Sequence, residues 1–207
     1  MPMTLKIILT LVIGYLLGSI STGVVLSKLF HNTDIRSQGS GNAGTTNMLR
    51  ILGRRMALFT FLGDMLKGII AVFIGKALVG GDLGGVLGVA GAVLGHYYPL
   101  YFGFKGGKGI ATSFGSLLFV FPVEALLAFS LFLILVAVTH YVSVGSVAAA
   151  FALPAILFFT HGDDLTVCLI TACIGASVIW RHRANIKRLI AGTESKLDFS
   201  KLKGKKK

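Results

Sequence analysis

The stretch IATSFGSLLFVFPVEALLAFSLFLILVAVT, residues 110–139, decides how often this chain crosses a membrane. Read as one span, it would place the basic C-terminal tail on the outer face, against the preference of Lys and Arg for the cytoplasmic side. Read as two spans that turn near Pro122–Glu124, it keeps the tail inside. We therefore predict two helices of about fifteen residues, each roughly 22 Å long and short of the ~30 Å apolar core. Such helices need shielding by their neighbours or local thinning of the bilayer.

The chain as a whole is too apolar for a soluble domain, because 54% of its 207 residues are hydrophobic and its mean hydropathy is +0.81. The predicted fold is an all-α integral membrane protein with about seven transmembrane helices, two of them short. We expect one polytopic domain over residues 1–195, followed by a basic tail, 196–207. The apolar runs cover residues 3–26, 56–79, 84–102, 110–121, 123–139, 144–160 and 165–180.

Positive charge is concentrated in three polar stretches, residues 28–55, residues 103–109 and everything after Trp180, which hold seventeen of the twenty Lys and Arg residues. The connections Gly80–Asp82 and His161–Asp164 contain acids and neither Lys nor Arg, so they are predicted to lie outside and the basic stretches inside. The net charge of +12 could also suit a nucleic-acid-binding protein. The chain has no basic helix and no aromatic stacking module, which argues against nucleic acid as a partner.

The first polar stretch contains GSGNAGTTNMLR, Gly39 to Arg50. Its glycines permit positive φ angles that turn backbone N–H groups toward an anion, and its hydroxyls, amides and Arg50 add donors. The match of Gly39–Gly44 to the dinucleotide fingerprint is weak, because no βαβ unit is available. The alternative is a flexible solvated loop. The candidate phosphate-binding residues are Gly39, Ser40, Gly41, Asn42, Gly44, Thr46, Asn47 and Arg50.

The second polar stretch is GFKGGKG, Gly103 to Gly109. It is not a nucleotide-binding P-loop, because Phe102 stands where that motif needs its first Gly and Gly109 stands where Ser or Thr should follow Lys. A glycine pair between two lysines still offers a backbone cradle with point charges. His96 precedes it and either is structural or has a catalytic or phosphate-contacting role. The candidates here are His96, Lys105, Gly107 and Lys108.

The third stretch, RHRANIKRLIAGTES (Arg181 to Ser195), could be no more than an interfacial anchor of positive charge. Asn185 favours a binding role, because an amide contributes nothing to such an anchor. Ser143, at the predicted inner end of the sixth span, reads as structural from the residues alone. Asp64 and Lys67, spaced i, i+3 in the second span, indicate a buried ion pair that orients helices or, alternatively, a proton relay.

Together these motifs resemble those of the bacterial acyl-phosphate:glycerol-3-phosphate acyltransferases, the PlsY family. The resemblance rests on GSGNAGTTN with Arg50, on GHYYP leading to FKGGKGIAT, and on RHRANIKRL with Gly192 and Glu194. It covers residues 14–195, and its departures are slight: Thr45 replaces the more usual Ala, and Ile110 replaces Val.

The resemblance implies a seven-helix enzyme that transfers a fatty acyl group from acyl phosphate to glycerol 3-phosphate. The products would be 1-acyl-glycerol 3-phosphate (lysophosphatidic acid) and phosphate, in the first acylation of bacterial phospholipid synthesis. It implies no cofactor, no metal, and neither coenzyme A nor a carrier protein as direct donor. The enzyme would lie in the bacterial cytoplasmic (inner) membrane with its active-site loops facing the cytoplasm. Its partners would be its two substrates, membrane lipids and a soluble enzyme that supplies acyl phosphate.

Family matching also raises Ser143 and His182 to site candidates. The expected catalytic residues are Ser40, Asn42, His96 and Lys108. The expected substrate-binding residues are Gly39, Gly41, Gly44, Thr46, Asn47, Arg50, Lys105, Gly107, Ser143, His182, Arg183 and Asn185.

Two alternatives stay open at this point. The first is a transporter of phosphate or phosphorylated solutes, which would carry charges near the bilayer midplane on broken helices in repeated halves. The charges here cluster at one face and no repeat is present. The second concerns the proton of the attacking hydroxyl, which could go to His96 or to the departing phosphate. We favour phosphate, because no Asp or Glu in the first two motifs could support a histidine base.

Overall fold

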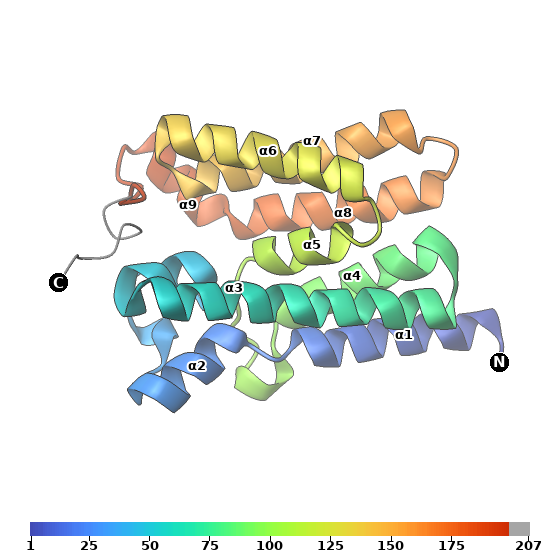
Figure 1. Cartoon of the computed structure of the whole chain (residues 1–207), viewed down its shortest axis with the longest axis horizontal. Coiled ribbons are helices and arrows are strands. Elements are labelled where there is room, and N and C mark those ends of the chain that lie inside the picture. The colour runs from blue at the N-terminus through green and yellow to red at the C-terminus, as the bar shows by residue number, and fades with distance from the viewer. Residues whose placement is uncertain (199–207) are drawn as a thin grey trace. The chain divides into compact units, whose positions relative to one another are not determined.

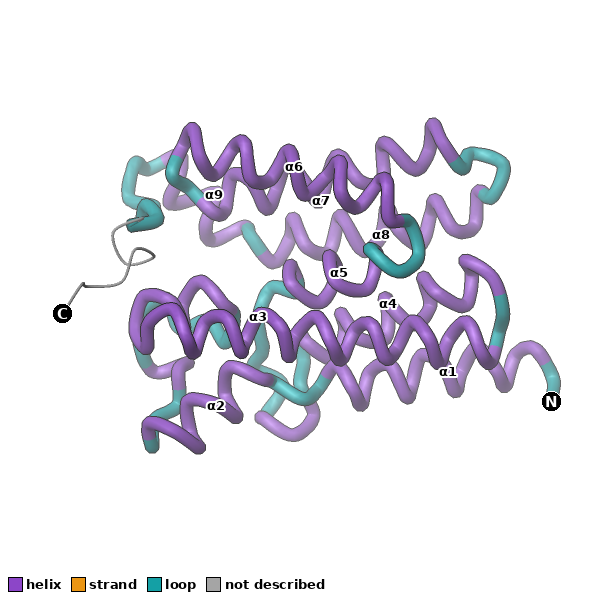
Figure 2. The backbone as a smooth tube through the Cα atoms, in the orientation of Figure 1, coloured by secondary structure: helices purple, strands orange, loops and turns teal. Residues whose placement is uncertain are grey.

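The computed structural model describes residues 1–198, and helices are the only regular secondary structure in this range (Figures 1 and 2). This confirms the predicted all-α class. The described chain forms two compact units, residues 1–120 and the part that begins at Phe121. Residues 199–207 of the predicted basic tail lie outside the described range.

The first unit is built around α3 (Thr45–Leu78), which packs against α1, α4 and α5 (Figure 1). Glycines allow the helices to approach closely: a Cβ on Gly18 would collide with the backbone of Ala92, and one on Gly75 with Gly84. Small residues at such crossings are typical of helix packing inside membranes. The other elements are α1 (Met3–Gly18), α2 (Thr22–His31), α4 (Gly81–Tyr97), α5 (Ile110–Leu117) and the 3₁₀ turns η1 (Ile35–Ser37) and η2 (Leu100–Phe102).

The first apolar run is broken, which its sequence did not indicate. The predicted span 3–26 divides into α1 and α2, and the helical segment reaches His31. At the break, the carbonyl of Tyr15 accepts both the N–H of Ser19 at 2.9 Å and its Oγ at 2.8 Å.

The second helix begins eleven residues earlier than its apolar run, which starts at Met56: α3 starts at Thr45. The polar sequence TTNMLR is therefore helical. Gly53 (φ 82°, ψ −177°) bends the helix near the point where the apolar run begins. Only glycine adopts this backbone geometry without strain.

The decisive stretch 110–139 forms two helices, as predicted, but of unequal length. α5 has eight residues, about 12 Å, and is too short to cross an apolar core by itself. α6 (Pro122–Thr139) has eighteen residues and begins at the proline, which is favoured in the first helical turn. The turn thus precedes Pro122 rather than following it.

The second unit is a row of helices in which α7 (Val142–Thr160) packs against α6 and α8 (Leu165–Arg181). The short α9 (Arg183–Ile190) continues from α8 with a bend of 51°. Asp164 caps α8 by accepting the N–H of Val167 at 3.0 Å. The segment after α9 returns to the α6–α7 connection, where Leu197 N–H donates to the carbonyl of His140 at 2.7 Å.

Five segments of the described chain are long and apolar enough to span a membrane, and the bent α8–α9 pair could be a sixth. Val138, Phe151 and Phe159 expose 70% or more of their surface, which is expected of helices that face lipid. The predicted count of seven spans stays a prediction. The five segments are Met3–His31, Thr45–Leu78, Gly81–Phe102, Pro122–Thr139 and Val142–Thr160.

Candidate active site

The first glycine-rich loop, residues 39–44, is held in shape by one buried side chain, that of Asn47. Its Nδ2 donates toward the carbonyls of Ile35, Gln38 and Asn42 at 2.9–3.1 Å. Its Oδ1 accepts the N–H of Ser40 at 2.9 Å. The amide is thus used inside the loop and holds its backbone in place. Direct binding of substrate by Asn47 stays a prediction.

Several backbone N–H groups of this loop donate hydrogen bonds within the loop itself. Gly39 and Gly41 have positive φ angles of 58° and 71°, as predicted, but Gly44 is extended at φ −89°. The N–H of Gly41 donates to the carbonyl of Gln38, and that of Gly44 donates to Asn42 Oδ1, both at 3.0 Å. With Ser40 included, three N–H groups of the expected anion cradle are therefore engaged within the loop.

The side chains expected to bind substrate lie beside this folded loop. Ser40 is exposed, and Asn42 is half-buried. Thr46 lies in the first turn of α3, and Arg50 lies one turn further along the same helix, both half-buried. The loop and the start of α3 thus bring hydroxyl, amide and guanidinium groups together around the N-terminus of a helix, where partial positive charge favours anions.

The second glycine-rich loop folds back along the end of α4. The N–H of Gly106 donates to the carbonyl of Tyr97 at 3.2 Å, and that of Gly107 donates to the carbonyl of His96 at 3.1 Å. Gly107 lies against the His96 ring so closely that a Cβ would collide with Nε2. Within this loop Lys105 is exposed and Lys108 is half-buried. The structure therefore brings the predicted His96 and the predicted lysine loop together.

Arg36, which belongs to none of the three predicted motifs, joins the two loops. Its Nη1 donates to the carbonyls of Phe102 at 2.6 Å and Lys105 at 2.8 Å. Its Nε and Nη2 donate to the carboxylate of Asp34 at 2.9 and 2.7 Å. The hydrogen bond from Arg36, with Lys28 nearby at 3.7 Å, lowers the pKa of Asp34 to about 2. The only signal in the sequence is an Asp-x-Arg placed just before the first motif.

A buried ion cluster lies behind His96. Lys67 Nζ is 2.9 Å from Asp64 Oδ1 and 3.0 Å from His96 Nδ1, and it donates to the carbonyl of Ile20 at 2.8 Å. All three charged or titratable side chains expose less than 5% of their surface. The spacing of Asp64 and Lys67 correctly predicted the ion pair. Sequence spacing could not reveal His96 as its third member, because it lies on a different helix.

In the second unit, three side chains converge on Glu194. Ser143 Oγ and Asn185 Nδ2 donate to Glu194 Oε1 at 2.9 and 2.6 Å, and Arg188 Nε donates to Oε2 at 2.7 Å. Burial raises the pKa of Glu194, but the hydrogen bonds from Asn185, Arg188 and Ser143 outweigh burial and lower it overall. The structure therefore brings the predicted Ser143 and Asn185 together. Glu194 was noted only as part of a motif, and its role as the common acceptor was missed.

His182 and Arg183 lie side by side in sequence at the bend between α8 and α9 but have different surroundings. His182 is buried, and its Nδ1 lies 2.8 Å from the carbonyl of Val178. Because a carbonyl only accepts, this hydrogen bond places a proton on Nδ1. Arg183 is exposed, donates to the carbonyl of Trp180 at 3.1 Å and stacks on its ring at 4.8 Å. This arrangement suits an interfacial anchor, and the substrate-binding role expected for Arg183 stays a prediction.

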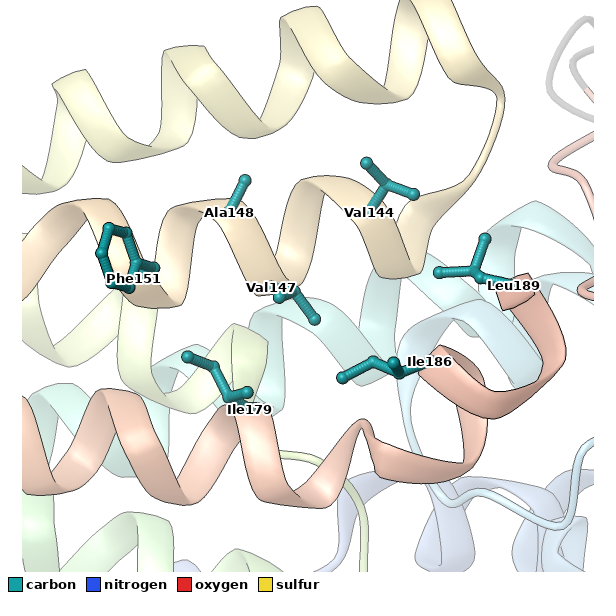
Figure 3. Close-up of a pocket in the computed structure, with 7 residues that line it drawn as sticks. All are labelled: Val144, Val147, Ala148, Phe151, Ile179, Ile186 and Leu189. Atoms are coloured by element: carbon teal, nitrogen blue, oxygen red, sulfur yellow. The ribbon is translucent and has the colours of Figure 1, made fainter.

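The second unit also contains an apolar pocket of about 430 Å³. Figure 3 shows the residues that line it on α7, α8 and α9. α9 therefore has two faces: Asn185 and Arg188 bond to Glu194, while Ile186 and Leu189 line the pocket. The pocket is lined by Val144, Val147, Ala148, Phe151, Ile179, Ile186 and Leu189.

Comparison with known proteins gives one consistent result. The family model for glycerol-3-phosphate acyltransferase matches residues 8–192. The glycerol-3-phosphate acyltransferase of Clostridioides difficile (strain 630) is 47% identical over 94% of this chain and 97% of its own length. That of Syntrophotalea carbinolica is 45% identical over 90% and 95%.

Solved structures agree. A crystal structure of PlsY, an integral membrane glycerol 3-phosphate acyltransferase, in its glycerol 3-phosphate form superimposes with a TM-score of 0.87 at 39% identity, covering 95% of this chain and 98% of that one. The lysophosphatidic acid form gives a TM-score of 0.83 at 38% identity, covering 95% and 97%. These matches favour an acyltransferase over a transporter.

Proposed function

Because this chain belongs to the glycerol-3-phosphate acyltransferase family, we propose that it takes its acyl group from acyl phosphate and forms lysophosphatidic acid and phosphate. The observation that carries the proposal is the pair of glycine-rich loops joined by Arg36 in the first unit. Each loop offers fixed donors or positive charge, which is what recognition of phosphate requires. A donor and an acceptor that both bring a phosphate close to the reacting carbonyl account for two neighbouring loops better than a thioester donor, whose reacting end carries sulfur and no phosphate.

The chemistry needs no covalent enzyme intermediate. An acyl phosphate is an activated mixed anhydride, so the hydroxyl oxygen of glycerol 3-phosphate can attack its carbonyl carbon directly. A carbon–oxygen ester bond forms, the bond from the carbonyl carbon to the phosphate oxygen breaks, and phosphate leaves with the electron pair. The hydroxyl proton passes to the departing phosphate. The protein then contributes orientation and stabilisation of the developing negative charge.

The proposed roles in the first unit differ between the residues of the first glycine-rich loop and the charged side chains. Ser40 and Asn42, with the backbone N–H of Gly39, are assigned to the acyl phosphate and to the developing oxyanion. Gly41 is assigned to the turn of the loop, because its N–H donates to the carbonyl of Gln38. Asn47 and Gly44 are assigned to the shape of the loop, because their hydrogen bonds are internal. Thr46 is assigned as a supporting donor at the start of α3.

The charged groups of the first unit are assigned to glycerol 3-phosphate. Arg50 offers a bidentate guanidinium, and Lys108 a point charge, for its phosphate. Gly107 keeps the second loop against His96, and Lys105, which is exposed, contributes to the positive field that attracts anionic substrates.

In the second unit, Ser143, His182 and Asn185 are assigned to substrate binding. Glu194 holds Ser143 and Asn185 in fixed orientations, so these two side chains are positioned before the substrate binds. The apolar pocket on α7, α8 and α9 suits a segment of acyl chain, because all the residues that line it are apolar.

The proposed setting is the cytoplasmic (inner) membrane of a bacterium, with seven crossings, the single domain 1–195 and the basic loops on the cytoplasmic side. Labelling of single cysteines tests it. Cysteines at Lys28 and Lys105 should react from the cytoplasmic side, and cysteines at Asp82 and Asp163 from the opposite side. Reaction of the Lys28→Cys and Asp82→Cys variants from the same side would contradict the proposed topology.

The donor is tested with purified protein and glycerol 3-phosphate, supplied with either palmitoyl phosphate or palmitoyl-coenzyme A. We expect lysophosphatidic acid and an equal amount of phosphate from the first donor and no product from the second. Product from palmitoyl-coenzyme A alone would refute the proposed donor while leaving the family assignment intact. Addition of a soluble enzyme that makes acyl phosphate should then support turnover from its own substrates.

A further inference from the structure

The Asp64–Lys67–His96 cluster fixes where His96 carries its proton. A Lys ammonium has three donors and no acceptor. Because Lys67 Nζ lies 3.0 Å from His96 Nδ1, a hydrogen bond between them requires Nδ1 to be the acceptor. A neutral imidazole that accepts through Nδ1 carries its hydrogen on Nε2.

The opposite tautomer fits the distances less well. A hydrogen on Nδ1 would have to point at Asp64 Oδ1, which is 3.7 Å away and beyond hydrogen-bond range. It would also face the Lys67 ammonium. A doubly protonated ring would place two positive charges 3.0 Å apart beside a single buried carboxylate.

The charge state of Lys67 follows from its other neighbours. The carboxylate of Asp64 at 2.9 Å and the carbonyl of Ile20 at 2.8 Å both accept only. A neutral amine would leave the Asp64 carboxylate without a counter-charge in the interior, at a cost of several kcal/mol. The Ile20 carbonyl comes from the break between α1 and α2, so the broken helix supplies part of the site that holds the ammonium.

The other ring nitrogen meets the second glycine-rich loop. Gly107 lies against Nε2, and the Gly107 N–H donates to the backbone carbonyl of the same histidine. The cluster therefore points a hydrogen-bond donor at this loop and gives Nε2 no lone pair with which to take a proton.

We propose that Lys67 and Asp64 are positioning residues for acyl transfer, which hold His96 neutral and protonated on Nε2 as a donor on the GFKGGKG side rather than as a general base. The proposal rests on the proposed function in assigning this loop to phosphate. The Nε2–H of His96 donates toward a phosphate oxygen bound at this loop and so fixes its position. The proton of the attacking hydroxyl goes to the leaving phosphate.

The tautomer can be measured directly. The chain has five histidines, so the ring signals of His96 in ¹⁵N-histidine-labelled protein are assigned as those lost in His96→Gln. We expect the pattern of a protonated Nε2 and an unprotonated Nδ1 at neutral pH. A wild-type ring protonated on Nδ1, or on both nitrogens, overturns the proposal without any reference to activity.

Variants test the positioning role. In Lys67→Met, the His96 ring should no longer prefer the tautomer with hydrogen on Nε2. Turnover should fall about 10²-fold, as expected when a reacting group is misplaced. Lys67→Arg, which keeps charge and donors, should restore the tautomer and part of the activity. The matched control is Lys76→Met on the same helix, because Lys76 contacts Asp82 and the carbonyl of Phe119 instead.

Two outcomes would separate the possible failures. A folded Lys67→Met protein with wild-type tautomer and turnover would overturn the positioning role. If Lys67→Met does not fold, the wild-type spectrum still decides the tautomer. Wild-type protein that makes no lysophosphatidic acid from acyl phosphate would refute the donor assignment and leave the measured tautomer as evidence on the cluster alone.

Discussion

The guanidinium of Arg36 donates a 2.8 Å hydrogen bond to the backbone carbonyl of Lys105, across 69 residues of sequence. This contact links the turn before the first glycine-rich loop to the second loop. Asp34 holds the other edge of the same guanidinium, so its plane is fixed. The two loops that we propose bind phosphate are therefore connected through one planar side chain with five donors.

Arg36→Lys should impair catalysis more than a conservative change on the surface. A lysine keeps the charge but cannot bond two carbonyls and a carboxylate in one plane. Loss of a charged hydrogen bond costs about 1.5–3 kcal/mol, and we expect kcat/KM to fall roughly 10–100-fold. The measurement is steady-state acyl transfer, with exposed Arg55→Lys as the control. Equal kinetics for the two variants would show that the Arg36 contacts do not position the loops.

The Asp34–Arg36 contact should persist over most of the acid range. The pKa of Asp34 is lowered to about 2 from its ordinary value of 3.8, so its contribution to stability is complete above pH 4 and is lost as pH falls toward 2. The difference in unfolding temperature between wild type and Asp34→Asn should therefore be constant from pH 7 to 4 and shrink below pH 4. A difference that already shrinks between pH 6 and 5 would contradict the lowered pKa.

Glu194→Gln should destabilise the second unit. The amide oxygen can still accept from Ser143 and Asn185, but the amide nitrogen then faces the donor Nε of Arg188. An unpaired polar group of this kind costs about 1–3 kcal/mol. Because the folded pKa of Glu194 is lowered, its contribution is present above its ordinary value of 4.5 and is lost as pH falls below it.

The measurement for Glu194 is thermal unfolding of wild type and Glu194→Gln at pH 7 and again below pH 4. The two unfolding temperatures should differ at pH 7 and converge in acid. Asp163→Asn, which removes an exposed carboxylate in the α7–α8 connection, should change little at either pH. Unfolding temperatures that stay equal at pH 7 would contradict a stabilising role for Glu194.

The sequence predicted the bounds of a helix well where an apolar run ends at polar residues. The runs 144–160 and 165–180 match α7 and α8 within two residues. It missed the division of α1 from α2, because Ser19, Ile20 and Ser21 fit a continuous apolar helix as well as a break. It also missed the early start of α3. The first residues of this helix are polar, so they lack the apolar pattern that predicts a span, and tertiary contacts determine that they are helical.

The candidate site shows the same limit. Residue types identified the glycine loops and their charges, and the i, i+3 spacing identified the Asp64–Lys67 pair. The role of Asn47 depends on three carbonyls that converge only after the loop has folded. The contacts of Arg36 and the position of His96 beside the Asp64–Lys67 pair depend on how separate helices and loops pack. No local pattern in the sequence encodes this packing.

Substitutions of His96 should distinguish a donor from a base. If Nε2–H acts as a donor, His96→Gln keeps an amide N–H close to the same position, whereas His96→Asn places its amide near Nδ1 instead. We expect His96→Gln to retain turnover within about 10-fold and His96→Asn to lose roughly 10²-fold. A general base would make both variants lose about 10²–10⁴-fold, because neither amide can take a proton. The check is kcat with glycerol 3-phosphate and palmitoyl phosphate at saturation, in variants whose unfolding temperatures match wild type. Equal, large losses for Gln and Asn would show that His96 accepts the proton and that the departing phosphate does not.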